Sequence, residues 1–276
     1  MEKSQDRLDI LEKIKEYEKN GWWDRDVEND PPTIELKPDK VDYLNKKLSS
    51  KIATYFANKA GTNFFEKMIK KKQFIIKEVR GIENYLAVKG GAVVTSNHFN
   101  PCENYAVYRA IKPHENKKFR LYKVIREGNY TNSPPPFGFI MRHCNTLPLS
   151  SNTETMKKFL SATKVLLGRG EKILIYPEQA MWWNYRKPRP CQNGAYKIAV
   201  MNNVPIIPVF ITMEDSDIIG PDGFPVQEYI VNFMPAIYPK EDLSRAENQN
   251  YLKEENFRVW KDCYENFYKI PLKYGE

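Results

Sequence analysis

Segments with the composition of strands alternate with helical segments along most of this 276-residue chain. A short apolar, β-branched run is typical of a buried strand, and a longer run with apolar residues three or four positions apart is typical of a helix. Their alternation favours an α/β domain. The expected strands are 91–96, 119–126, 146–149, 172–176, 204–212 and, at the sheet edge, 229–237, and the expected helices are 153–167, 194–201 and 241–268.

Composition agrees with one domain of enzyme size. With 41% hydrophobic and 13% aromatic residues, the chain can bury a substantial core. We expect a single α/β domain with a central mixed sheet at residues 79–276, preceded by amphipathic helices in an N-terminal segment at 1–78. The four cysteines are widely scattered and there are three histidines, which is too few for a convincing metal-ligand set. We therefore expect no metal and no cofactor.

An imidazole and a carboxylate follow the strand expected at 91–96. His98 comes directly after that strand and Glu103 stands five residues later. Asn100 is a good N-cap and Pro101 suits the first helical position, so we expect His98 in a strand-to-helix turn and Glu103 in the first helical turn. Neutral histidine is a natural general base, and a carboxylate on its other ring nitrogen fixes the tautomer. Two structural alternatives stay open: a capping box formed by Asn100 and Glu103, and a histidine without a catalytic role.

Three later segments follow this pair in order: Gly138–Arg142 (GFIMR), Ile175–Ala180 (IYPEQA) and Val204–Val209 (VPIIPV). Together with His98 and Glu103 they resemble the four sequence blocks of the glycerolipid acyltransferase superfamily, which includes the 1-acylglycerol-3-phosphate acyltransferases. The resemblance implies an acyltransferase-type α/β domain. It also implies transfer of an acyl group from a thioester to a hydroxyl, with His98 as the base and Glu103 orienting it.

The same blocks imply a set of substrate-binding residues. By resemblance, the arginine of the second block contacts the acceptor phosphate, a role that suits a planar bidentate donor. The glutamate of the third block is associated with acceptor binding. The residues expected to bind substrate are Asn100, Arg142, Pro177 and Glu178. For Arg142 the alternative is an ordinary surface arginine. The strand of the fourth block is expected to belong to the hydrophobic core, and any role in lining a pocket is secondary.

Two blocks depart from the family pattern. Glu103 replaces the usual aspartate and is one methylene longer. The third block keeps Pro-Glu, but Gln-Ala-Met stands where Gly-Thr-Arg is expected. A longer loop could bring a replacement cation to the site, and the candidates are Arg186, Lys187 and Arg189.

Positive charge is concentrated in residues 40–72. Nine lysines there face only Asp42 and Glu66, a net charge of +7 in a chain whose total is +8. Apolar residues recur at helical spacing on both sides of Gly61, which predicts two short amphipathic helices. Lysines beside an apolar face are typical of a helix lying on an anionic membrane. The alternative is a helical pair packed on the domain with a solvated lysine face.

These observations favour a peripheral membrane enzyme of phospholipid biosynthesis. No stretch approaches the roughly 20 apolar residues that span a bilayer, and the charged N-terminus lacks the apolar core of a secretory signal, so we expect a cytoplasmic protein on the cytoplasmic face of a membrane. The expected donor is acyl-CoA or acyl carrier protein, and the acceptor is a lysophospholipid, with lysophosphatidic acid favoured. Alternatives are a thioesterase using the same His-Glu pair and a non-catalytic lipid-surface binding protein. Nucleic acid is not an expected partner, because no known binding module is present.

Overall fold

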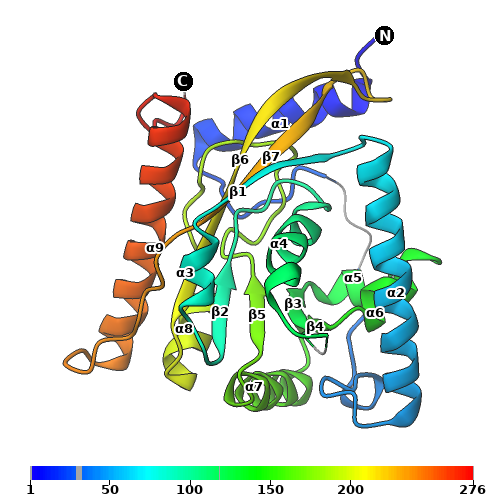
Figure 1. Cartoon of the computed structure of the whole chain (residues 1–276), viewed down its shortest axis with the longest axis vertical. Helices are drawn as coiled ribbons and strands as arrows, with labels where there is room; N and C mark the ends of the chain where they lie inside the picture. Colours follow the sequence, from blue (N-terminus) through cyan, green and yellow to red (C-terminus); the bar gives the residue numbers. More distant parts are fainter. Residues whose placement is uncertain (1, 29–32, 118, 276) are drawn as a thin grey trace.

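Seven strands form one sheet within residues 2–28, 33–117 and 119–275, which are the parts of the chain that the computed structural model describes (Figure 1). Their order across the sheet is β1-β7-β6-β2-β5-β3-β4. The strands are β1 (Ile75–Arg80), β2 (Ala92–Thr95), β3 (Leu121–Ile125), β4 (Thr146–Pro148), β5 (Lys172–Ile175), β6 (Ile206–Ile219) and β7 (Pro225–Phe233).

Strand direction determines which loops share an edge. β2 pairs in parallel with both β5 and β6, and β3 pairs in parallel with β5 and β4. β7 runs antiparallel to β6, and β1 is parallel to β7. The sheet is therefore mixed, as expected. Because β2 and β5 are parallel neighbours, the residues that follow them meet at one edge of the sheet, which is where ligands collect in open α/β sheets.

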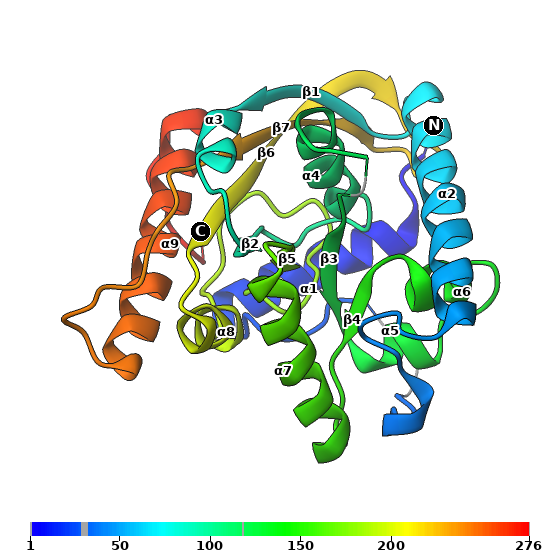
Figure 2. The ribbon, with the colours of Figure 1, turned by 60° about the horizontal axis from the view of Figure 1, so that its bottom comes forward.

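Helices cover both faces of the sheet (Figures 1 and 2). α4 packs on one face, and α7, α8 and α9 pack on the other. The described helices are α1 (Gln5–Asn20), α2 (Leu48–Lys70), α3 (Ile82–Leu86), α4 (Glu103–Ile111), α5 (Glu127–Thr131), α6 (Phe137–His143), α7 (Thr153–Gly168), α8 (Gly194–Asn202) and α9 (Arg245–Tyr268). None of them combines the length and the apolar character that crossing a bilayer requires.

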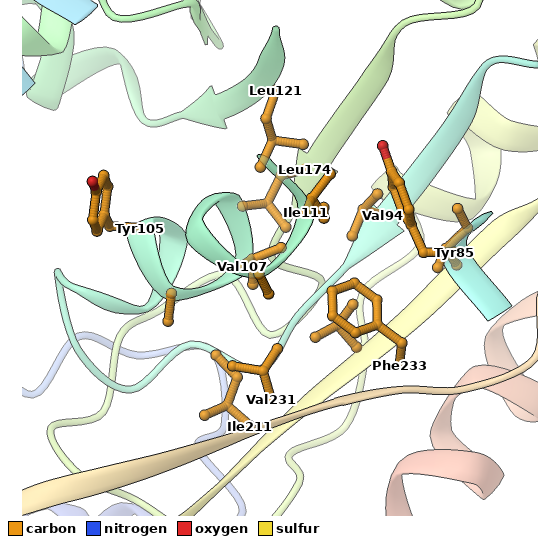
Figure 3. Packing of buried hydrophobic residues seen from close by; sticks show 14 of the residues in the cluster. Tyr85, Val94, Tyr105, Val107, Ile111, Leu121, Leu174, Ile211, Val231 and Phe233 are labelled. Atoms are coloured by element: carbon orange, nitrogen blue, oxygen red, sulfur yellow. The ribbon is translucent and has the colours of Figure 1, made fainter. Parts of the chain in front are cut away.

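The central strands are buried on both faces. In β2, Val94 points to the core beneath α4, while Val93 joins the core beneath α7 and α8, as the two-residue period of a strand requires. Figure 3 shows Val107 and Ile111 of α4 lying against this first core, beside Val94. Such packing on both faces explains why these strands are almost continuously apolar in sequence.

One expectation about the strands is wrong, and one strand was not expected. The strand expected at the edge over 229–237 runs over Pro225–Phe233 and lies between β1 and β6. The edge is taken by β1, which pairs with β7 and which the sequence pattern did not suggest. Residues 77–80 of β1 are exposed, so charged residues interrupt the apolar alternation that identifies a strand. β1 also runs across residues 78 and 79, the expected domain boundary.

The two short amphipathic helices expected around Gly61 are one continuous helix, α2. Gly61 does not break it, because it is buried where α2 packs on α6. A Cβ at Gly61 would lie 3.4 Å from the Sγ atom of Cys144 and 3.8 Å from Ile140. The glycine therefore permits close approach of two helices.

The two faces of α2 have different environments. On the inner face, the Phe65 ring stacks on Tyr105 with centroids 4.7 Å apart, and Met68 and Ile69 pack against the core. The outer face exposes large apolar side chains to solvent, namely Leu48, Ile52, Tyr55, Phe56 and Phe64. One face thus fixes α2 to the domain, and the other is left uncovered.

Replacement of Phe65 should therefore affect stability more than replacement of its neighbour Phe64. Phe65→Ala removes a core contact and should lower the free energy of unfolding by about 2 kcal/mol, somewhat below the usual cost for a fully buried phenylalanine. Phe64→Ala should cost less than about 1 kcal/mol. Urea denaturation of both variants measures the difference, and equal losses would contradict the assignment of the two faces.

Candidate active site

Glu103 lies at the start of α4 with its carboxylate buried; it is 1% exposed. One oxygen, Oε2, accepts hydrogen bonds from the backbone N–H groups of Phe99 (2.6 Å) and Asn100 (2.7 Å). The other, Oε1, contacts Nδ1 of His98. The capping interaction and the contact with the imidazole therefore coexist in one carboxylate.

The turn that carries His98 differs slightly from expectation. The helix begins at Glu103, with Cys102 as its N-cap, rather than at Pro101. Asn100 still organises the turn, because its side-chain oxygen accepts from the backbone N–H of Cys102 at 3.0 Å. This local hydrogen bond satisfies the Cys102 amide outside the helix and delays the helix start.

Tyr176 packs against one face of the His98 imidazole. Its ring stacks on His98 with centroids 4.1 Å apart and an interplanar angle of 15°. Its hydroxyl oxygen is buried without a hydrogen-bond partner among the described residues. Burial, and next the neighbouring Glu103 carboxylate, raise the pKa of this hydroxyl well above 10. Our sequence reasoning missed Tyr176, although it directly precedes Pro177 in the third block.

Glu178 approaches the same turn from the end of β5. It is 2% exposed, and its Oε2 atom accepts from the backbone N–H of His98 at 2.9 Å. Oε2 also pairs with the Nη2 atom of Arg189 at 3.0 Å, and Oε1 accepts from the backbone N–H of Arg189 at 2.8 Å. A buried carboxylate is tolerated only when it is paired and hydrogen-bonded in this way.

Of the three cations that could replace the third-block arginine, Arg189 contacts Glu178. Arg186 pairs with Asp215 at 2.6 Å, and Lys187 pairs with Glu18 at 2.6 Å. Both of these bridges are partly exposed, whereas the Arg189 side chain is fully buried. The longer loop therefore brings a guanidinium to Glu178 from eleven residues downstream.

Two of the expected substrate-binding residues have contacts within the turns. The carbonyl of Pro177 accepts from the backbone N–H of Gln192 at 2.7 Å. The side-chain amide of Asn100 donates to Asn184 at 3.4 Å. Both lie in loops at the edge that holds His98, and binding of substrate by Asn100 and Pro177 stays a prediction.

Arg142 lies elsewhere, in the last turn of α6. Its Nη1 atom donates to the carbonyl of Tyr130 at 3.4 Å, and it lines a small polar pocket that includes Asp42. In the described part of the chain, no hydrogen bond or ion pair joins Arg142 to His98 or Glu178. The structure thus gathers the first and third blocks but does not bring Arg142 into contact with them.

This arrangement suits proton transfer by His98. A carboxylate can only accept, so the hydrogen on Nδ1 points to Glu103 and the lone pair lies on Nε2. The imidazole is partly exposed, with 22% of its side-chain surface accessible. Cys102 does not compete as a nucleophile, because burial raises the pKa of its thiol to about 12 and the reactive species is the thiolate.

Comparisons with known proteins agree with the fold. A family model described as Acyltransferase matches residues 77–212, a range that contains His98, Glu103, Arg142 and Glu178. The fold is similar to the crystal structure of the 1-acyl-sn-glycerophosphate (LPA) acyltransferase PlsC from Thermotoga maritima, with a TM-score of 0.53 and 18% sequence identity over 84% of this chain and 87% of that chain. No curated protein matches the chain.

Proposed function

Residues 77–212 form an acyltransferase domain of the glycerolipid acyltransferase superfamily, and on this premise we propose that the chain transfers a fatty acyl group from a thioester donor to a lysophospholipid hydroxyl. The observation that carries the proposal is the buried Glu103 carboxylate on Nδ1 of a partly exposed histidine. That pair lies at the carboxyl end of β2, next to Glu178 at the end of β5.

The reaction follows from the direction of the imidazole. Nε2 of His98 removes the proton from the acceptor hydroxyl as its oxygen attacks the thioester carbonyl. Glu103 keeps the proton on Nδ1 and stabilises the imidazolium that forms. Collapse of the tetrahedral intermediate expels the thiolate, which takes the proton back from Nε2. The acceptor oxygen acts as the nucleophile, so no acyl-enzyme is required.

Lysophosphatidic acid is the favoured acceptor. The similar structure from Thermotoga maritima is of a 1-acyl-sn-glycerophosphate acyltransferase, and Arg142 stands in the block that carries the phosphate-binding arginine of the superfamily. For the donor, a net charge of +8 suits both acyl-CoA, through its phosphates, and the acidic acyl carrier protein.

We further propose that the outer face of α2 lies on the cytoplasmic surface of an anionic membrane. Leu48, Ile52 and Phe56 are exposed and recur every four residues, so they form one stripe, and exposed Phe64 lies about two turns further along α2. The stripe continues onto α6, where exposed Phe137 contacts Phe64 with ring centroids 5.7 Å apart. Lysines flank it, namely Lys47, Lys51, Lys59 and Lys67, all exposed. Apolar insertion and attraction to anionic lipid would act together on this face.

Replacement of the base should abolish transfer without unfolding the protein. His98→Ala should lower turnover by about 100-fold to 10,000-fold, the usual contribution of a general base, and Glu103→Gln should lower it less. Release of thiol from acyl-CoA, with lysophosphatidic acid as acceptor and lipid products identified by mass spectrometry, measures both. Unchanged turnover in folded His98→Ala protein would contradict the mechanism. Equal donor hydrolysis with and without acceptor would identify a thioesterase.

Loss of the second-block arginine should weaken acceptor binding selectively. Arg142→Ala should raise the KM for lysophosphatidic acid by about 10-fold to 100-fold, because a hydrogen bond to a charged group contributes about 1.5 to 3 kcal/mol. The KM for acyl-CoA should change little, and Arg142→Lys should recover part of the loss. If a monoacylglycerol without phosphate is as good an acceptor as lysophosphatidic acid, the role of Arg142 is wrong.

Binding to membranes should depend on the stripe and on the charge beside it. Two variants test the α2 face: Leu48→Ser with Ile52→Ser and Phe56→Ser, and Lys47→Gln with Lys51→Gln and Lys59→Gln. At about 1 kcal/mol for each cation near the surface, the lysine variant should bind phosphatidylserine vesicles roughly 100-fold more weakly at low salt. The serine variant should lose the binding that persists at high salt.

The matched control removes three exposed lysines from α7: Lys157→Gln with Lys158→Gln and Lys164→Gln. This control should sediment with vesicles as the wild type does. If it loses binding as strongly as the α2 lysine variant, net positive charge rather than the α2 face attracts the vesicles.

A further inference from the structure

The third block lacks its usual arginine, and Arg189 occupies an unusual place beside the remaining glutamate. In addition to its pair with Glu178, the Nη2 atom of Arg189 donates to the carbonyls of His98 (3.2 Å) and Ala180. Its guanidinium also lies over the ring of Trp182, 4.6 Å from the centroid. The side chain is 0% exposed. A guanidinium so enclosed is not available to a substrate phosphate.

The contacts of Arg189 converge on the backbone of His98. The N–H of His98 donates to Glu178, and its carbonyl accepts from Arg189 and from the backbone N–H of Trp182 at 3.1 Å. The next carbonyl, that of Phe99, accepts from the backbone N–H of Asn184 at 2.9 Å. The loop that follows β5, which we call the third-block loop, therefore hydrogen-bonds to both the backbone N–H and the carbonyl of His98. Glu103 and Tyr176 contact its ring.

A segment that precedes the family match in the sequence contacts Arg189 as well. Residues 22–27, which we call the strap, follow α1 and cross to the third-block loop. The Nη1 atom of Arg189 donates to the carbonyl of Trp23 at 2.9 Å, and the Trp23 ring stacks on Trp182 with centroids 5.7 Å apart. Nε1 of Trp182 donates to the carbonyl of Arg25 at 2.9 Å, and Val27 is buried in the same apolar cluster.

We propose that Arg189 is a positioning residue, which fixes the backbone of His98 through Glu178 and the His98 carbonyl and is itself held in place by the strap. This inference rests on the proposed function, because it assigns Arg189 a role in orienting the catalytic base. It also explains how the chain functions without the third-block Gly-Thr-Arg: a cation from a longer loop orders the site instead of contacting the acceptor.

The test separates turnover from substrate binding. Misplacement of a catalytic group by about 1 Å can lower the rate about 100-fold, so Arg189→Met should lower kcat by roughly that factor while the KM for lysophosphatidic acid stays within about 2-fold. Arg189→Lys keeps the charge beside Glu178 but cannot reproduce the fork of contacts, and it should recover part of kcat. Trp23→Ala, which removes the strap's ring contact, should also lower kcat. The matched control is Arg186→Met, in the same loop, which should behave as wild type.

Each alternative gives a different result. A raised KM for lysophosphatidic acid with kcat retained would mean that Arg189 binds the acceptor, and it would overturn the proposal. Unchanged kcat per folded molecule, with only a lower melting temperature, would overturn it too, because Arg189 would then serve stability alone. If Arg189→Met does not fold, Arg189→Lys at a temperature well below its melting transition provides the same comparison.

A readout independent of activity distinguishes failure of this inference from failure of the proposed function. Diethyl pyrocarbonate modifies accessible neutral imidazoles, and mass spectrometry can follow His98, with His114 and His143 as references in the same protein. The rate of His98 modification should rise several-fold in Arg189→Lys while the two reference rates stay constant. An unchanged His98 rate would overturn the positioning role, whether or not the wild type transfers acyl groups.

Discussion

One buried carboxylate organises the candidate site. Transfer of the Glu103 carboxylate from water into the protein costs several kcal/mol unless its lone pairs are used. Here it receives hydrogen bonds from the Phe99 and Asn100 amides and contacts His98. Hydrogen bonds to a charged group contribute about 1.5 to 3 kcal/mol each, which is enough to offset that cost. The same carboxylate therefore stabilises the turn and contacts the imidazole, so local folding and the orientation of the His98 ring depend on the same atoms.

The sheet supplies the second constraint. β2 and β5 are parallel neighbours, so their following loops are necessarily adjacent, and Glu178 reaches the His98 amide without any long excursion of the chain. The charge of Glu178 needs its own partner, and Arg189 provides it from within the protein. The buried ion pair of Glu178 and Arg189 thus contacts the backbone of His98 directly. Since loss of one partner of such a pair costs about 3 to 5 kcal/mol, the loop that carries Arg189 is firmly tied to the turn of His98.

Much of the fold could be predicted from sequence, because the central strands are short apolar runs and the helices α7 and α9 have helical spacing and begin at side-chain caps. Ser244, for example, forms a capping box with Glu247 at the start of α9. The edge strand β1 could not be predicted, since an edge strand needs only one buried face and its charged residues hide the pattern. The break expected at Gly61 was wrong for a different reason. A glycine inside a helical pattern costs about 1 kcal/mol relative to alanine, which weakens the prediction of one continuous helix, and the close contact with Cys144 shows why a residue without a side chain is needed here.

In the candidate site, the blocks were sufficient to identify His98, Glu103 and Glu178 as neighbours. Arg189 could be named as a candidate from its charge, but its selection over Arg186 and Lys187 depends on the path of a loop that has no periodicity. Tyr176 and the strap contribute through stacking and backbone carbonyls, which a sequence does not display. The surroundings of Arg142 could not be predicted from its block either, because its contact with Tyr130 depends on how α5 and α6 pack.

The central claim is that Glu103 holds the His98 imidazole with its proton on Nδ1 and leaves Nε2 as the proton acceptor. Nitrogen-15 NMR of the protein labelled at histidine tests this most directly, at a pH high enough for the imidazoles to be neutral. The signals of His98 are assigned by comparison with His98→Gln. The account predicts that Nδ1 gives the chemical shift of a protonated nitrogen and Nε2 that of an unprotonated one. A spectrum in which Nε2 carries the proton would contradict it.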